Sequence, residues 1–324
     1  MIADVAIDPL GRVWVADGMQ QEITLFEPDG RLVRVIGRKG AGPAEFGAIA
    51  GFDWAPDGRL WVVDGGNARF AVYDTAGNLV GTHPRPSNLT ITPWPGGIDR
   101  DGRLADVAAA GSFEGQRNRS LVRVAADGRP LDTLRLPSVQ DEFFGEITSG
   151  TEKDRHVKRA PVPFTGKPIW GVDPEGYAWI GRTDRYRLER TRFDGSIERA
   201  IELENTPPRV SRADRDQILR NYRWFEQQGG KLDPSRIPDT HPDLVNLFFD
   251  DTGHLWVIPA YRFQQKPALD IFNLQGRYLG QIQAPVPFAS HPAPAIRGGL
   301  MAAMAVDQDG VHSVVLMRIE KPGR

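Results

Sequence analysis

One phrase recurs along this chain. Residues 57–74 read DGRLWVVDGGNARFAVYD, and a close copy, DPLGRVWVADG followed by ITLFEPDGRL, starts at Asp8. Weaker copies start at Asp99, Asp173, Asp250 and Asp307, and the last of them is incomplete. Each copy joins an apolar stretch, a turn of the Asp-x-x-Gly kind and short strands separated by further glycine turns. A repeat of this length constrains the fold more than any local pattern does.

Short antiparallel strands repeated around a ring are typical of a β-propeller, in which each blade buries its faces against its neighbours. We therefore predict an all-β protein: a six-bladed β-propeller of four-stranded antiparallel blades, with an incomplete last blade, as the single domain 1–324. The predicted blades lie near residues 1–37, 47–83, 94–136, 168–203, 244–283 and 300–319, and a helical insertion occupies 204–243, between blades 4 and 5. The incomplete blade leads us to expect that an upstream segment completes it, and that without this segment strand edges are exposed.

The repeated positions have simple physical roles. The aspartate at the start of the first turn can accept hydrogen bonds from backbone amides two residues on, and the glycine of that turn tolerates positive φ. A tryptophan occupies the same position in the second strand of four copies, at Trp14, Trp61, Trp179 and Trp256. Because a large flat side chain at equivalent positions fills the gap between blades, these four are expected in the core.

Composition excludes several classes of protein. The 324 residues carry a formal charge of −2 and no cysteine, so disulfides, thiolate zinc sites and cysteine nucleophiles are excluded. No apolar run approaches the roughly 18 residues of a membrane span, and no signal-peptide pattern is visible. Nucleophile-elbow, P-loop and dinucleotide fingerprints are absent. The arginine-rich segment 182–192, RTDRYRLERTR, is interrupted by acids, which together with the charge disfavours nucleic acid as a partner.

Residues 40–81 resemble an NHL repeat. They carry a Gly-Pro-x-Glu-Phe lead-in, a D-x-x-N-x-R turn at Asp64, Asn67 and Arg69, and a closing Asp-x-x-Gly. The whole chain resembles the six-bladed NHL and TolB-like propellers of bacteria, which include peptidylglycine lyases, virginiamycin B lyase, gluconolactonase-type lactonases and many non-enzymatic binding and sensor domains. The resemblance implies a periplasmic or extracellular location and leaves the activity open.

The long links of the predicted propeller emerge together on one face, around the mouth of the central channel. Loops of more than about 12 residues in a compact domain are usually functional or disordered, so the ligand is expected on this face. Since the lyases of this superfamily use a tyrosine and an arginine, the resemblance implies ligand-binding candidates in these links. They are Arg185, Tyr186, Tyr261 and Arg262.

One long link predicts a helix. In SRADRDQILRNYRWFEQQ, residues 211–228, Ser211 is a plausible N-cap, and Ile218, Leu219, Tyr222 and Phe225 recur at helical spacing before Gly229 ends the helix. We expect this helix over the channel mouth. Its arginines then either face an anionic ligand, as a lid, or lie on the solvated side of an amphipathic helix packed on the propeller. Arg220 and Arg223 are the ligand-binding candidates here.

Two sets of residues are candidate metal ligands. The innermost strands carry Asp4, Asp53 and Asn246 among small residues, and oxygen ligands of this kind suit a hard cation. The resemblance to lactonases implies calcium there; a solvated channel entrance explains the same residues. His241 and His291 lie in long links, each followed by proline, and imidazoles from such loops can bind zinc. Calcium and zinc are therefore the candidate cofactors.

The favoured interpretation is a non-enzymatic binding protein that recognises a small-molecule or peptidic ligand on the loop-rich face. A metal-dependent lyase or lactonase with its site at the channel mouth is the first alternative. The second alternative is a protein-interaction scaffold that binds a partner protein through an exposed apolar patch on the same face.

Overall fold

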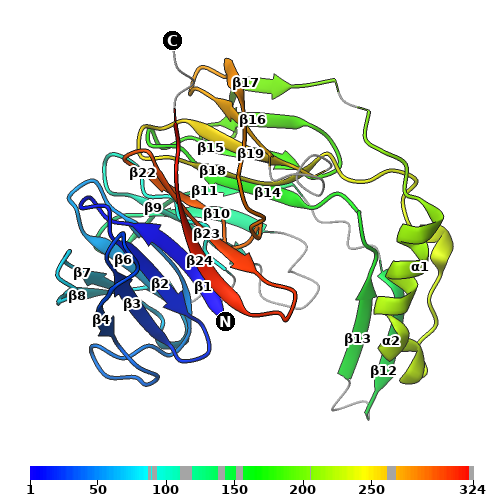
Figure 1. Ribbon diagram of the computed structural model, residues 1–324, viewed down its shortest axis with the longest axis horizontal. Coiled ribbons are helices and arrows are strands. Elements are labelled where there is room, and N and C mark those ends of the chain that lie inside the picture. Colours follow the sequence, from blue (N-terminus) through cyan, green and yellow to red (C-terminus); the bar gives the residue numbers. More distant parts are fainter. Residues whose placement is uncertain are drawn as a thin grey trace.

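The computed structural model describes residues 1–86, 89, 93–109, 119–137, 143–150, 156–204, 206–260 and 268–320. It is a six-bladed β-propeller with a small helical insertion, which confirms the predicted fold (Figure 1). Blade 1 consists of β1 (Ile2–Ile7), β2 (Val13–Asp17), β3 (Glu22–Phe26) and β4 (Leu32–Ile36). Blade 2 consists of β5 (Ile49–Trp54), β6 (Leu60–Asp64), β7 (Arg69–Tyr73) and β8 (Leu79–Pro84), with a 3-10 turn, η1 (Gly65–Asn67).

Blades 4 and 5 repeat the four-stranded antiparallel order. Blade 4 consists of β14 (Pro168–Val172), β15 (Ala178–Arg182), β16 (Arg187–Thr191) and β17 (Ile197–Glu202). Blade 5 consists of β18 (Leu244–Phe249), β19 (Leu255–Pro259), β20 (Ala268–Phe272) and β21 (Tyr278–Gln283).

Blades 3 and 6 depart from this pattern. Blade 3 is the three-stranded sheet β9 (Leu104–Ala109), β10 (Arg119–Val124) and β11 (Pro130–Arg135), and its first strand is reduced to one isolated bridge, Ile98 to Leu104. The expected four strands are thus wrong for this blade. Blade 6 contains β22 (Ala295–Arg297), β23 (Leu300–Val306) and β24 (His312–Arg318); β23 and β24 form the usual first hairpin, and β22 pairs with the other side of β23. In the described part of this blade no third or fourth strand follows, as predicted.

The first turn of each blade shows why the repeat exists. In blade 1, Asp8 accepts hydrogen bonds from the amides of Leu10 and Arg12, both at 2.9 Å, and Gly11 has φ +82°. The same carboxylate also accepts the indole N–H of Trp14, at 3.2 Å. Trp179 and Trp256 donate in the same way to Asp173 and Asp250, both at 3.0 Å. The repeated aspartate therefore fixes both the turn and the rotamer of the tryptophan between blades.

The four repeated tryptophans are buried, as predicted. In blade 1, Trp14 packs with side chains of blade 2, including the ring of Trp54, whose centroid lies 5.4 Å away. Blade 2 has Ala55 in place of the turn aspartate, and its Trp61 stacks instead on His83, with centroids 5.0 Å apart. The core thus consists of apolar layers between successive blades, and β1 contacts β23 to bring the two ends of the chain together (Figure 1).

Two insertions form a side lobe that lies away from the blades in Figure 1. The link between blades 3 and 4 contributes the hairpin β12 (Phe143–Ser149) and β13 (His156–Pro161), and the link between blades 4 and 5 contributes α1 (Arg212–Asn221), α2 (Arg223–Gln227) and the 3-10 turn η3 (Pro234–Arg236). Ile218 and Phe225 of the helices pack with Ala160 and Val162 in a small separate core. The predicted helix and its Ser211 N-cap are confirmed, with a full capping box to Asp214. Neither helix is long and apolar enough to span a membrane.

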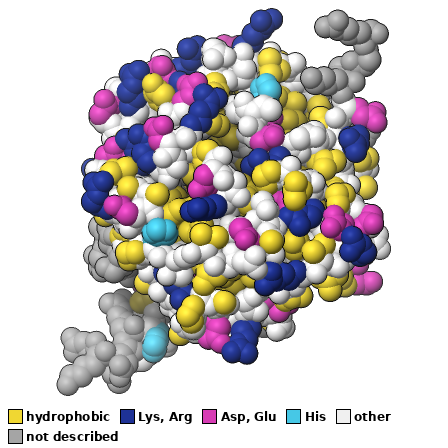
Figure 2. All heavy atoms as spheres, turned by 90° about the vertical axis from the view of Figure 1, so that its left-hand side faces the viewer, with side chains coloured by type: hydrophobic (Ala, Val, Ile, Leu, Met, Phe, Trp, Pro, Cys, Tyr) yellow, Lys and Arg dark blue, Asp and Glu magenta, His cyan; other side chains and the backbone are white. Residues whose placement is uncertain are grey.

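The surface carries charges of both signs. On the face shown in Figure 2, lysine and arginine side chains alternate with aspartate and glutamate, consistent with the net charge of −2. This face presents no continuous basic stripe of the kind that tracks a nucleic-acid backbone.

Candidate functional site

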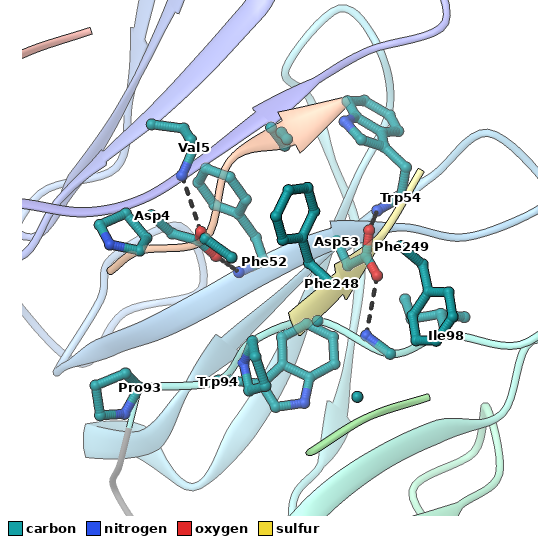
Figure 3. A pocket seen from close by; sticks show the side chains of 18 of the residues that line it. Asp4, Val5, Phe52, Asp53, Trp54, Pro93, Trp94, Ile98, Phe248 and Phe249 are labelled. Atoms are coloured by element: carbon teal, nitrogen blue, oxygen red, sulfur yellow. Dashed lines mark hydrogen bonds between the residues drawn. The ribbon is translucent and has the colours of Figure 1, made fainter. Parts of the chain in front are cut away.

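A cavity of about 1010 Å³ occupies the axis of the propeller. Its walls come from the first strands β1, β5, β14 and β18, from β22, and from the links 93–98 and 291–294. Figure 3 shows the part of the cavity between Asp4, Asp53, Trp94 and Phe248. The site therefore forms where the innermost strands of the blades converge.

Asp4 lies at a bulge in β1, where the register with β2 shifts between Ile2 and Asp4. One carboxylate oxygen accepts the amide of Val5 at 2.9 Å, and the other reaches the next blade and accepts the amide of Phe52 at 2.8 Å (Figure 3). Gly51 makes room for this contact, because a Cβ there would lie 2.9 Å from the carboxylate. Burial raises the pKa of Asp4 well above its usual value, and the nearby charge of Asp53 acts in the same direction against the two amides.

Asp53 repeats this arrangement one blade further on. It accepts the amide of Trp54 at 2.8 Å and the amide of Gly97, in the link that leads into blade 3, at 3.0 Å. Burial raises the pKa of Asp53, while the two amides and the positive charge of Arg297 oppose the rise. Two carboxyl groups in one cavity thus have a raised pKa, a condition common at functional sites.

Asn246 has the position in β18 that Asp4 has in β1, seven residues before the turn glycine of its blade. Its side-chain oxygen accepts the amide of Leu247 at 2.9 Å, and its amide group donates to the carbonyl of Ser290 at 3.0 Å. All three side chains line the cavity, as expected for residues of the innermost strands. Asp4 bonds to the first strand of the next blade, whereas Asp53 and Asn246 bond to the link that leads into the next blade. Across the described residues, no group of three or more histidine, aspartate or glutamate side chains could hold a metal ion.

The two candidate histidines lie in different places. His291 lines the central cavity, where partial burial and the charge of Lys167 lower its pKa. His241 lies at the side lobe: its ring packs on Phe164, with centroids 4.5 Å apart, and its Nε2 lies 3.3 Å from a carboxylate oxygen of Asp214. The structure therefore brings one of them, His291, to the cavity that holds Asp4 and Asp53.

The candidate arginines and tyrosines do not line the cavity where they are described. Tyr186 is buried between blades 4 and 5, and its hydroxyl lies 2.9 Å from a carboxylate oxygen of Asp270. Arg185 is exposed beside it, and Arg220 and Arg223 are exposed on the lobe helices. The predicted position of this helix over the channel mouth does not hold: no residue of α1 or α2 lines the central cavity, and the helices pack with the β12–β13 hairpin in the side lobe, away from the blades in Figure 1. Tyr261 and Arg262 lie outside the described residues.

Sequence reasoning missed the aromatic lining of the cavity. Trp54, Trp94 and Trp170 line it, with Phe52 and Phe248. None of these tryptophans occupies the repeated position that the other four buried ones share, and the eighth, Trp224, lies on the lobe. A tryptophan that breaks the repeat was the signal that could have located the site.

A family model described as "6-bladed beta-propeller" (DUF5128) matches residues 3–89. No curated protein matches the sequence significantly. Solved structures with a similar fold include virginiamycin B lyase from Staphylococcus aureus, with 10% identity and a TM-score of 0.46 over 98% of this chain and 85% of that one. A gluconolactonase from Xanthomonas campestris has 13% identity and a TM-score of 0.45, over 91% of this chain and 79% of that one. The calcium-binding protein regucalcin from Agrobacterium tumefaciens has 13% identity and a TM-score of 0.44, over 99% of this chain and 92% of that one.

Proposed function

We propose that this protein binds a small-molecule or peptidic ligand in the central cavity. The observation that supports the proposal is the cavity itself, whose volume of about 1010 Å³ is at the upper end of ligand sites and whose walls include three tryptophans and three phenylalanines. A few polar groups converge on it, among them Asp4 and Asp53. Apolar walls supply affinity in such sites, and a small number of polar groups fixes the orientation of the ligand.

A ligand screen followed by tryptophan fluorescence tests the proposal, because three tryptophans line the cavity. Trp170→Ala removes a half-buried wall side chain, and Trp224→Ala removes an exposed one on the lobe as a matched control. We expect Trp170→Ala to weaken binding of any hit by about tenfold or more, since a buried aromatic contact contributes on the order of 2 kcal/mol. Equal affinity in both variants would place the ligand elsewhere and contradict the proposal.

The alternative of a metal-dependent lyase or lactonase has one observation in its favour, the raised pKa of Asp4 and of Asp53 in the cavity. To bind calcium, these carboxylates would have to share oxygens that already accept backbone amides. Elemental analysis of protein purified without chelator, with melting curves with and without EDTA, separates the two functions. About one equivalent of metal and a large EDTA shift would favour the enzyme.

A further inference from the structure

The cavity is not symmetric about the propeller axis. Because the first strand of blade 3 is reduced to the bridge between Ile98 and Leu104, the cavity extends outward into this blade. There its walls include Val107 of β9, Arg119 of β10 and Leu136 after β11. In the described parts of the other blades the walls come from first strands, β22 and links. We call this extension, lined by Val107, Arg119 and Leu136, the blade-3 branch.

Arg119 is the charged group of the branch. Its Nε atom is buried, and among the described residues no group accepts its hydrogen. The buried arginines Arg85 and Arg190 are paired: Arg85 lies 2.8 Å from Asp106, and Arg190 lies 2.7 Å from Asp173. Arg119 as a whole is half-buried, but a buried N–H without an acceptor is unfavourable in the free protein, so a ligand that supplies an acceptor would be favoured at this position.

The surroundings of Arg119 restrict the chemistry of that acceptor. Trp94 and Trp170 line the same cavity, and Trp94 is held in place by a 2.7 Å hydrogen bond from its indole to the carbonyl of Ala105. The cavity is also lined by Arg100 and Arg297, but Arg119 is the arginine of the blade-3 branch, and apolar walls with a guanidinium at this end suit a ligand with an apolar body and an anionic end. The planar guanidinium matches a carboxylate with two parallel hydrogen bonds.

We propose that the blade-3 branch binds the carboxylate end of an amphipathic small molecule or peptide through Arg119. This inference rests on the proposed function and names the class of its ligand. The raised pKa of Asp4 and of Asp53 is consistent with it, since a raised pKa lessens the negative charge that these carboxyl groups would set against an anion.

The test uses two probes of the same shape, 4-phenylbutyrate and 4-phenylbutyramide, followed by ligand-observed NMR and calorimetry on the full chain. We expect the acid to bind about tenfold or more tightly than the amide, because the carboxylate is charged and can accept two parallel hydrogen bonds from the guanidinium, whereas the amide is neutral and has one acceptor oxygen. Arg119→Met keeps the aliphatic stem and should abolish this preference, and Arg119→Lys should retain part of it. Arg185→Met, at an exposed arginine, is the control that should leave it unchanged.

The outcomes separate this inference from the proposed function. If both probes bind equally and Trp170→Ala weakens both, the cavity binds ligands and Arg119 does not select them, which overturns the inference alone. If neither probe binds, the inference is overturned, and the proposed function depends on the wider screen. Melting temperature gives a second reading: Arg119→Met should leave it unchanged or raise it, whereas a fall like that expected for Arg85→Met would assign Arg119 a structural role and overturn the inference.

Discussion

The turn aspartates allow a matched test of what the repeat contributes to stability. Asp173 is fully buried and accepts four hydrogen bonds, from the amides of Glu175 and Tyr177, from the Trp179 indole, and from Arg190 at 2.7 Å. Asp307 opens the same turn in blade 6, but it is exposed and accepts two, from the amides of Asp309 and Val311. The change Asp→Ala therefore removes the same side chain from two different environments.

The structure gives the size of the two effects. Each hydrogen bond contributes about 1 kcal/mol net, so the four bonds to Asp173 together contribute about 4 kcal/mol. Asp173→Ala also leaves Arg190 buried, although Glu175 and Glu198 still pair with it. We expect Asp173→Ala to lower the free energy of unfolding by about 4 kcal/mol and Asp307→Ala by about 1 kcal/mol, because water replaces the carboxylate at the exposed turn.

Scanning calorimetry of the two variants measures the difference. At roughly 2 °C per kcal/mol for a domain of this size, Asp173→Ala should melt about 8 °C below the wild-type protein and Asp307→Ala about 2 °C below it. Equal shifts would show that the turn itself, common to both sites, supplies the stabilisation. That result would refute the role assigned to the buried indole and guanidinium bonds.

Three further changes test other parts of the structure. The pKa of Asp4 is raised in the folded state, so its contribution to stability is full below the unfolded pKa of 3.8 and is lost as the pH rises through the folded pKa. In denaturant titrations, the free energy of unfolding of the wild type relative to Asp4→Asn should therefore fall from pH 4 to pH 7. Ser211→Ala removes a capping box and should destabilise the lobe by about 1 kcal/mol, seen as faster hydrogen exchange in α1 with unchanged protection in the blades. Gly51→Ala should cost about 2 kcal/mol in thermal or denaturant unfolding, because its Cβ would lie 2.4 Å from a backbone carbonyl, whereas Gly81→Ala, with no atom within 4 Å, should not destabilise the protein.

The repeated part of the fold could be predicted because its chemistry is local. An aspartate that bonds amides two and four residues on, and a glycine with positive φ, form the same turn wherever they occur, so Asp8 and Gly11 predict the turn between β1 and β2. The contact between Trp14 and Asp8 was not predicted, although its spacing of six residues recurs in blades 4 and 5. The pattern fixed which residues recur but not which of them touch.

The partner of the inserted helix could not be predicted, since it comes from another insertion. The apolar spacing of Ile218 and Phe225 shows that α1 and α2 bury one face, but it does not say against what. The hairpin that covers this face has no counterpart in the repeat, and its own residues were assigned to a long link. Helix and hairpin meet only because two consecutive links emerge on the same side of the propeller.

The candidate site could be predicted only in part, for the same reason: its contacts join different blades. The alternation along β1 and β5 placed Asp4 and Asp53 on the channel, but not the amides of Phe52 and Gly97 that occupy their oxygens, because those contacts join neighbouring blades. The cavity branch beside Arg119 depends in turn on a strand that fails to form. Where a repeat builds the scaffold, a binding site needs departures from it, and residues at unrepeated positions, such as Trp94 in PWPGG, are the first to examine in a chain of this kind.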